Sequence, residues 1–519
     1  MIRAMSTASP SVLFRADASP AMGIGHVMRC LTLAAALTER GSHCRLACTH
    51  ETLRTVAALR HAAIEVVELP DGAACDPAAL TALPAPDWVV IDHYRLGADY
   101  ERRLRPWAER ILVIDDLADR RHDCDILLDQ TVGRRAESYA GLVPASALVL
   151  AGPAHALLRP GFAAARRTYP DEPCSELRAK PGAPCGAKAK PTDVGARRLR
   201  GDMRILVSLG GTDPLNATAT VLDALAAADL GIAVTVVMGS AAPALEQVRA
   251  QAARLRPPAE LAVDVADMVA LMTSCDLAVG AAGTSALERC CLGLPTLLLV
   301  IADNQREVAA GLAQAGAAVV AVLDAADIAG KLADLAGDAE ARRRLAEQGR
   351  MLCDGAGAGR LADLMRLTLR PATAGDGEEL LRWRNDPVTR DNSLDTAEVA
   401  RDHHFAWLER ALSDPERVLL IAERDGVKLG MVRFDTCCEG EWRVSISVAP
   451  AARGRGIGGA LLSAAILRLE RERGPSVLYA EIRAANRPSQ RIFEACGFRR
   501  TDSDDGVAYY RRGAAEAIY

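Results

Sequence analysis

Aromatic residues are scarce in this 519-residue chain, since Phe, Trp and Tyr together make up only 4% of it. Aliphatic side chains must therefore fill its hydrophobic cores. Neither sign of charge dominates, because 62 Lys and Arg against 67 Asp and Glu leave a net charge of −5. A chain without a strong positive field does not attract a polyanion, so we expect no nucleic acid partner.

Long apolar runs are missing as well. The longest, residues 294–302, contains Pro295 and is about half of the ~20 residues that span a bilayer, so we expect a buried strand there and no membrane partner. The 14 cysteines are scattered, without a C-x-x-C pair or a His–Cys spacing typical of zinc sites, and no secretion signal is recognisable. These patterns predict reduced thiols, a cytoplasmic protein and no bound metal.

The chain does contain two regions in which short apolar runs alternate with segments of helical period, residues 1–165 and 203–355. Such alternation predicts doubly wound parallel sheets, which bind ligands at the carboxyl ends of their strands. Between them, residues 166–202 are rich in Pro, Gly and Lys and read as a linker or a disordered insertion. In residues 366–513 neighbouring strands are close enough in sequence to pair antiparallel, which predicts an α+β domain.

The first strand of the first domain leads into a glycine-containing turn. Asp17 follows the strand, and Gly23-Ile24-Gly25-His26 runs into a helix, where glycines and a helix N-terminus favour a bound anion. Met28 stands where the dinucleotide fingerprint requires its third glycine, which disfavours NAD. From its position alone, His26 fits a capping histidine and a general base equally well.

A second loop cluster, Asp92-His93-Tyr94, follows the fourth strand. An isolated cluster of this kind more often satisfies its own backbone than binds a substrate.

Two strand-to-helix turns of the second domain could hold phosphate groups. Residues 210–211 offer backbone amides, and residues 283–285 add two hydroxyls to a helix start. Glu288 could accept both hydroxyls of a ribose. Thr284 could equally be an N-cap, with Glu288 favouring the helix dipole. The candidate ligands here are Gly210, Gly211, Gly283, Thr284, Ser285, Glu288, Asn304 and Gln305.

Five motifs resemble, in this order, those of the UDP-sugar hydrolases of pseudaminic acid biosynthesis. They occupy residues 17–30, 91–96, 209–214, 281–288 and 302–305. These enzymes hydrolyse UDP-2,4-diacetamido-2,4,6-trideoxy-β-L-altropyranose to UDP and the free sugar. The resemblance extends over most of the first two domains and implies an α/β two-domain glycosyltransferase-B-like fold.

This resemblance also implies roles for individual residues. His26 would be the general base, Glu288 the ribose ligand, and the amides near Gly211 and Thr284 the pyrophosphate contacts. The second domain would hold the nucleotide, and the sugar would face the first domain. The substrate-binding residues implied in the first domain are Asp17, Gly25, Arg29, His93 and Tyr94.

The third domain has a Gly-rich turn between a strand and a helix, with the pattern Arg-x-x-Gly-x-Gly from Arg453 to Gly458. Backbone amides and the helix N-terminus suit a pyrophosphate, whereas the Gly-Lys-Ser/Thr of an ATP-binding P-loop is missing. With Asn486, Ser489 and residues 493–498, the domain resembles the GNAT N-acetyltransferases, which implies acetyl-CoA as cosubstrate. The implied cofactor-binding residues are Val448, Arg453, Gly454, Arg455, Gly456, Ile457, Gly458, Gly459, Asn486 and Ser489.

One position departs from the GNAT pattern. Many of these enzymes have a Tyr where this chain has Phe493, and that Tyr protonates the departing CoA thiolate. Tyr509 and Tyr510 are therefore the candidates for the general acid. The segment Trp383-Arg-Asn-Asp-Pro resembles the GNAT branch that acts on sugar nucleotides or protein termini.

Together these features predict a bifunctional enzyme. The GNAT domain would acetylate the 4-amino group of a UDP-sugar, and the first two domains would hydrolyse the diacetamido product. Two alternatives use the same features: a glycosyltransferase with an acceptor other than water, and a GNAT domain that is only an acetyl-CoA-binding regulatory or docking module, which Phe493 favours.

Overall fold

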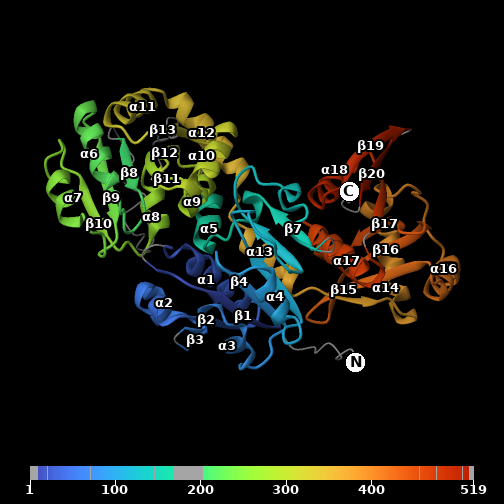
Figure 1. The fold of residues 1–519 in the computed structure, drawn as a ribbon. Coiled ribbons are helices and arrows are strands. Elements are labelled where there is room, and N and C mark those ends of the chain that lie inside the picture. Colours follow the sequence, from blue (N-terminus) through green and yellow to red (C-terminus); the bar gives the residue numbers. More distant parts are fainter. Residues whose placement is uncertain are drawn as a thin grey trace, which may run out of the picture. The chain divides into compact units, whose positions relative to one another are not determined.

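The computed structural model describes eight stretches of the chain, which form three sheets (Figure 1). They are residues 10–19, 22–70, 72–144, 147–168, 203–454, 456–474, 476–504 and 506–513. Arg455 and most of the expected insertion at residues 166–202 lie outside the described residues.

Contacts between residues divide the chain into two compact units. The first contains Met1–Asp129, Arg135–Leu150 and Gly359–Tyr519, and the second contains Gln130–Arg134 and Ala151–Ala358. The first unit therefore holds the first and third sheets, and the second unit holds the second sheet.

The first sheet has the strand order β3-β2-β1-β4-β5-β6-β7, and β1 to β6 are parallel. All five residues of β4 are buried, as expected for a parallel strand covered on both faces. Because the order reverses between β1 and β4, the carboxyl ends of these two strands form a topological switch point, where ligands bind in such sheets. The strands are β1 (Ser11–Ala16), β2 (His43–Cys48), β3 (Glu65–Glu68), β4 (Trp88–Asp92), β5 (Arg110–Ile114), β6 (Ile126–Asp129) and β7 (Leu148–Ala151), and the helices are α1 (Gly25–Thr38), α2 (His50–Thr55), α3 (Pro77–Thr81) and α4 (Ala98–Leu104).

The second sheet has the order β10-β9-β8-β11-β12-β13, and all its printed pairings are parallel. Ile205 and Val207 belong to one core cluster and Leu206 to another, as the period of two in a strand requires. The strands are β8 (Arg204–Ser208), β9 (Ala233–Met238), β10 (Glu260–Val263), β11 (Leu277–Ala281), β12 (Thr296–Leu299) and β13 (Val319–Ala321). The helices are α5 (Pro160–Thr168), α6 (Ala217–Ala228), α7 (Leu245–Ala252), α8 (Met268–Thr273), α9 (Thr284–Leu292), α10 (Arg306–Gln314), α11 (Ala325–Gly337) and α12 (Ala339–Leu352). Most of the next helix, α13 (Gly357–Met365), belongs to the first unit.

The third sheet has the order β14-β15-β16-β17-β18-β20-β19 and is antiparallel except between β17 and β18. These two strands pair only between Glu441–Arg443 and Val477–Tyr479 and then part, since β17 continues to Val448 and β18 to Arg483. The strands are β14 (Thr368–Pro371), β15 (Arg417–Arg424), β16 (Val427–Cys438), β17 (Glu441–Val448), β18 (Val477–Arg483), β19 (Arg499–Asp504) and β20 (Val507–Arg512). The helices are α14 (Gly377–Asn385), α15 (Pro387–Asp391), α16 (Arg401–Ser413), α17 (Ile457–Arg473) and α18 (Arg487–Ala495).

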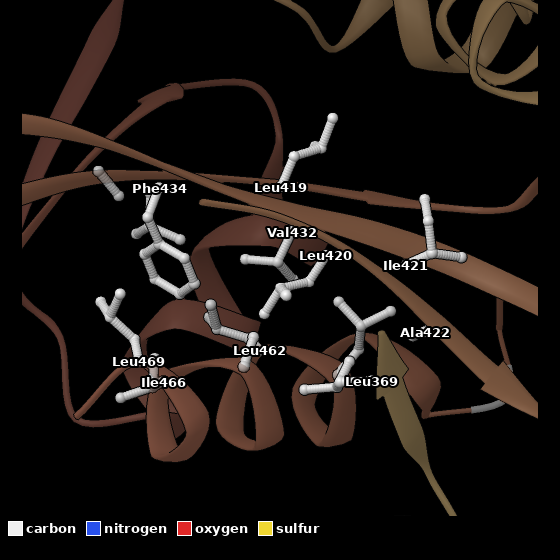
Figure 2. Packing of buried hydrophobic residues seen from close by; sticks show 14 of the residues in the cluster. Leu369, Leu419, Leu420, Ile421, Ala422, Val432, Phe434, Leu462, Ile466 and Leu469 are labelled. Atoms are coloured by element: carbon white, nitrogen blue, oxygen red, sulfur yellow. The ribbon is translucent and has the colours of Figure 1, made fainter. Parts of the chain in front are cut away.

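Helix α17 packs under this sheet, as Figure 2 shows. Leu462, Ile466 and Leu469 are four and three residues apart, so they share one face of the helix, and this face meets Val432 and Phe434 of β16. This packing holds α17 against the sheet, so that the helix begins at Ile457, a short connection after β17 ends at Val448.

Two doubly wound parallel sheets followed by an α+β domain confirm the expected fold class, a glycosyltransferase-B-like pair of domains with a GNAT domain. The run at residues 294–302 contains a buried strand, β12, as expected. Within the described ranges, no helix is long and apolar enough to cross a membrane. No cluster of three or more His, Cys, Asp or Glu side chains there could hold a metal ion.

Candidate active sites

A histidine and a carboxylate form the centre of the candidate site in the first unit. His26 is the second residue of α1, and its Nδ1 lies 2.5 Å from Oδ1 of Asp92, the last residue of β4. The register of β1 and β4 places Ala16 beside Asp92, so the turn into α1 and the end of β4 are neighbours. A carboxylate at Nδ1 fixes the imidazole tautomer and leaves Nε2 as the nitrogen that can take a proton. The pair has the arrangement of a general base.

Arg29 keeps Asp92 ionised. Its Nε and Nη2 donate hydrogen bonds of 2.5 and 2.7 Å to the two Asp92 oxygens, and its Nη1 donates one of 3.0 Å to Asp116. Burial raises the pKa of Asp92, but Arg29 and His26 lower it more, so that it lies at about 2. The guanidinium of Arg29, expected to bind substrate, is thus occupied in orienting the His26–Asp92 pair.

Tyr94 packs against the His26–Asp92 pair. Its ring packs edge-on against the imidazole of His26, with 4.4 Å between the ring centroids. His26 is only 4% exposed, so the base has little freedom to turn away from Asp92.

Asp17 and His93 lie beside each other and are buried, and of their polar side-chain atoms Nε2 of His93 has no hydrogen-bond partner among the described residues. Asp17 accepts hydrogen bonds from Arg15, Thr49 and Thr52 at 2.6 to 3.1 Å. Burial raises the pKa of Asp17, while His93, Arg15 and Thr49 lower it, and the net effect is a strong decrease. The ring of His93 accepts the Arg95 amide at Nδ1 and directs Nε2 toward Asp17 at 3.4 Å. These two predicted substrate residues therefore join β1 to α2 and to the end of β4.

The two predicted phosphate turns of the second unit follow adjacent strands, because β8 and β11 are paired. Ideal Cβ atoms on Gly210, Gly211 and Gly283 would meet no atom within 4 Å, so these backbones face open space. Gly283 is the N-cap of α9, and no side chain caps this helix. The alternative interpretation of Thr284 as an N-cap is therefore wrong, and the first amides of α9 are left for other acceptors.

Glu288 lies one turn into α9, and two arginines, Arg159 and Arg289, attract its carboxylate. Its Oε1 is 3.7 Å from Nη2 of Arg159, and burial raises its pKa. Among the other two predicted ligands, Gln305 uses its side-chain oxygen to accept the Ile301 amide at 3.0 Å, whereas Asn304 is exposed.

The third sheet carries a cavity of about 560 Å³ where β17 and β18 part. Its charged lining has four arginines and two carboxylates, and Trp383 and Trp407 add aromatic surface. His404 also lines it, but burial lowers the pKa of His404 and so favours its neutral form. The charged lining residues are Arg384, Arg433, Arg443, Arg483, Asp395 and Glu481. The lining is therefore positive overall at neutral pH.

The predicted cofactor turn lies directly after β17. Gly456 has a φ of 74° and is the N-cap of α17, which no side chain caps. A Cβ on Gly459 would meet no atom within 4 Å, whereas one on Gly458 would lie 2.6 Å from Cδ1 of Ile492. Gly458 therefore lets α17 approach α18, and Gly454, Gly456 and Gly459 leave the helix N-terminus open.

Other predicted cofactor residues hold this region together. Arg453 donates to Asp386 at 2.6 Å and to Thr389 at 2.5 Å, so its guanidinium ties the turn to α15. Asn486 caps α18 by accepting the Ser489 amide at 3.1 Å, and both residues line the cavity.

The two tyrosines proposed as general acid lie elsewhere. Tyr510 is 1% exposed and its hydroxyl donates to Glu494 at 2.9 Å, while Tyr509 is 37% exposed on the same strand. Neither is among the residues that line the cavity, which instead include Phe493.

Sequence reasoning missed three residues. Asp92 was visible only as part of a loop cluster, although its place at the end of the strand next to β1 is a usable signal. Arg384 lies in the segment Trp383-Arg-Asn-Asp-Pro but was not singled out, and the buried Arg289 of α9 lies just outside the motif of residues 281–288.

The comparisons with known proteins cover these same parts. The Acetyltransferase (GNAT) domain model matches residues 366–499. The UDP-2,4-diacetamido-2,4,6-trideoxy-beta-L-altropyranose hydrolase of Campylobacter jejuni is 32% identical over 152 residues, which are 29% of this chain and 53% of that protein. The spore coat polysaccharide biosynthesis protein SpsG of Bacillus subtilis is 32% identical over 174 residues, covering 32% of this chain and 42% of that protein.

A third relative is the UDP-N-acetylglucosamine–N-acetylmuramyl-(pentapeptide) pyrophosphoryl-undecaprenol N-acetylglucosamine transferase of Chromobacterium violaceum. It is 36% identical over 174 residues, covering 32% of this chain and 48% of that protein. The chain thus spans about half the length of these curated relatives. Its N-terminal part is homologous to the Campylobacter hydrolase and to SpsG, and a GNAT acetyltransferase domain follows, so the chain is a fusion of the two.

Proposed function

We propose that the chain is a bifunctional nucleotide-sugar enzyme of pseudaminic acid biosynthesis. Its GNAT domain transfers an acetyl group from acetyl-CoA to the 4-amino group of a UDP-sugar. Its hydrolase part then cleaves the product, UDP-2,4-diacetamido-2,4,6-trideoxy-β-L-altropyranose, to UDP and the free sugar. The similarity to the Campylobacter hydrolase and the match to the GNAT model support this pair of reactions.

The His26–Asp92 pair carries the hydrolase proposal. Nε2 of His26 removes a proton from a water molecule while the water oxygen attacks the anomeric carbon. The bond between this carbon and the diphosphate oxygen breaks, and UDP leaves with the electron pair. Asp92 stabilises the imidazolium that forms, as its short contact with Nδ1 allows. The open amides at Gly211 and at the start of α9 supply hydrogen bonds to the departing UDP.

His26→Ala tests this mechanism. The variant should lose about 10²- to 10⁴-fold in kcat, the usual contribution of a general base, while its dissociation constant for UDP stays unchanged. His43→Ala, at an exposed position on β2, is the matched control. Near-normal turnover of His26→Ala would show that another group activates the water.

The bond that breaks can be identified with labelled water. Attack at the anomeric carbon places the ¹⁸O of the solvent in the sugar. Label recovered in UDP would mean that water attacks phosphorus, which contradicts the proposed mechanism.

The cation-rich cavity between β17 and β18 carries the acetyltransferase proposal. The neutral amine of the acceptor attacks the thioester carbonyl, a C–N bond forms, the C–S bond breaks, and CoA leaves as the thiol once it is protonated. Four arginines against two carboxylates favour an acceptor with phosphate groups and disfavour a polyamine. A UDP-sugar amine has this chemistry.

Arg384→Gln tests the nature of the acceptor. One guanidinium nitrogen of Arg384, Nη1, is buried and has no hydrogen-bond partner among the described residues. A phosphate oxygen of the acceptor could accept a hydrogen bond from it. We expect the KM for the UDP-4-amino sugar to rise about tenfold, and that for acetyl-CoA to stay unchanged. Arg382→Gln is the matched control, because Arg382 lies on the same helix but pairs with Glu379 and does not line the cavity. Equal acetylation of spermidine and the UDP-sugar by the wild-type chain would contradict an anionic acceptor.

Similarity to the Chromobacterium transferase favours one alternative, a glycosyltransferase that passes the sugar to an acceptor other than water. Both reactions release UDP. Release of UDP from the diacetamido substrate in buffer, with no acceptor added, distinguishes the hydrolase from this alternative.

A further inference from the structure

A buried arginine lies under the start of α9 in the second unit. Arg289 is only 1% exposed, and its guanidinium folds back toward the turn between β11 and α9. Its Nη2 donates to the Ala281 carbonyl at 2.8 Å and its Nη1 donates to Oγ of Ser285 at 3.2 Å. Its Nε is buried and has no hydrogen-bond partner among the described residues.

The fold makes room for this side chain at one glycine. A Cβ on Gly280 of β11 would lie 2.6 Å from Cζ and Nη1 of Arg289. Any larger residue at this position would push the guanidinium away from Ala281 and Ser285. Gly280 and Arg289 therefore act as a pair that brings a cation beneath the turn.

Glu288 attracts Arg289 electrostatically, but no carboxylate forms an ion pair with it among the described residues. The carboxylate of Glu288 instead lies 3.7 Å from Arg159. Burial lowers the pKa of Arg289 to about 10, so the side chain is still charged at neutral pH. A buried, unpaired cation is unfavourable, and here it lies at the positive end of a helix dipole.

An anion above the turn would remove this imbalance. Arg289 can only donate, so Oγ of Ser285 accepts from it and its own hydroxyl proton is left to donate outward. The uncapped amides of α9 and the exposed Thr284 lie at the same turn. Gly280 of β11 pairs with Ser208 of β8, so the Gly210–Gly211 turn is adjacent.

We propose that Arg289 is a positioning residue that makes this site selective for the diphosphate of UDP over an uncharged nucleoside, acting through the Ser285 hydroxyl and the α9 amides. This inference rests on the proposed function, which assigns UDP to the second unit. The guanidinium lies behind the turn and therefore adds attraction without filling the space of the ligand. Because it is buried, its effect is screened little by salt.

Calorimetric titration of the full chain with UDP and with uridine tests the proposal. Arg289→Gln should weaken UDP binding about tenfold or more and leave uridine binding unchanged. Arg289→Lys has one nitrogen in place of the two that contact Ala281 and Ser285, so it should recover only part of the loss. The ratio between wild-type and Arg289→Gln affinities should be the same at low and at high salt. Arg166→Gln is the matched control, because Arg166 donates at 3.3 Å to the carbonyl of Cys291, near the other end of α9, and at 3.2 Å to the carbonyl of Cys353, the C-cap of α12.

Gly280→Ala provides a second variant if Arg289→Gln folds poorly. It keeps the arginine but displaces it, so UDP affinity should fall while uridine affinity stays the same. Unchanged UDP affinity in both variants, or equal losses for UDP and uridine, would overturn the proposal. A wild-type chain that binds neither ligand would instead refute the assignment of UDP to this unit.

Discussion

Asp92 decides which nitrogen of His26 can act as a base. Its carboxylate contacts Nδ1 at 2.5 Å and is itself held by Arg29, so a single network sets the tautomer and the orientation of the ring. Since the pKa of Asp92 lies at about 2, its carboxylate is charged at neutral pH.

Asp92→Asn should therefore lower kcat by about 10²- to 10⁴-fold, because the neutral amide no longer stabilises the imidazolium. UDP binding should be unchanged. Asp87→Asn, at the other end of β4, is the control, because Asp87 accepts hydrogen bonds from Ser11 at 2.7 and 2.8 Å and is far from the base in the strand. An Asp92→Asn variant with full activity would remove Asp92 from the mechanism.

The carboxylates around His122 should make the stability of the first unit depend on pH. Its Nδ1 lies 2.7 Å from Glu101 and its Nε2 3.8 Å from Asp115, which also contacts Arg120 and Tyr139. Burial lowers the pKa of His122, but Asp115 and Glu101 raise it more, from 6.5 to about 9. The raised pKa means that the folded state binds the proton more tightly than the unfolded state does.

The stabilisation from His122 should thus be complete below pH 6.5 and should disappear as the pH rises through about 9. It corresponds to roughly 3 kcal/mol. Denaturant unfolding of wild type and His122→Gln should show a difference that is largest near pH 6 and small near pH 10. A difference independent of pH would mean that His122 contributes by packing alone.

The positions of backbone groups were predicted well where a motif fixes the backbone, whereas side-chain directions were not predicted. Glycines at 210, 211 and 283 lie in open turns, as their sequence context indicated. The hydroxyl of Tyr510, by contrast, turns to Glu494, and Arg289 folds back under its own helix. No spacing in the sequence specifies such directions, because they depend on which space the neighbouring elements leave.

At the scale of elements, two neighbouring glycines at the start of α17 have different surroundings. Gly458 is a packing residue, since its missing side chain admits Ile492 of α18. Gly459 occupies the third position of the helix and faces open space. A substitution at Gly458 would disturb the packing of α17 against α18. Gly459 is therefore the better position for a substitution that tests cofactor binding.

Gly459→Asp should raise the KM for acetyl-CoA at least tenfold, because its carboxylate would repel the pyrophosphate at the helix start. The same charge is favourable to the helix dipole, so the melting temperature should not fall. Gly459→Ala is the control and should bind acetyl-CoA nearly normally. An unchanged KM in Gly459→Asp would place the cofactor elsewhere.

The elements themselves followed from periodicity. Alternating apolar runs and helical segments predicted two parallel sheets, and close-set strands predicted the antiparallel third one. The parting of β17 and β18 could not be predicted, since it depends on where two strands distant in sequence stop pairing. That parting forms the cavity proposed to bind the acceptor, so the sequence did not reveal this cavity, although it did reveal the Gly-rich turn after β17.

At the scale of the whole molecule, the two proposed reactions use residues attached to different sheets. His26→Ala should leave acetylation of the UDP-4-amino sugar intact, and Gly459→Asp should leave hydrolysis of the diacetamido substrate intact. Mixing the two variants with the UDP-4-amino sugar and acetyl-CoA should restore formation of the free sugar, measured by mass. Loss of both activities in either single variant would show that the two sites are coupled.

The first unit is assembled from chain segments on both sides of the second. Asp363 pairs with Arg40 at 2.8 Å, and the Met365 carbonyl accepts from the indole of Trp88 at 3.1 Å. A ribosome therefore completes the whole second unit before it delivers the last pieces of the first. All seven strands of the first sheet are translated before most of the second unit, but the Met365 carbonyl that accepts from Trp88 is translated after it, so the indole of Trp88 gains this partner only when the second unit has been synthesised.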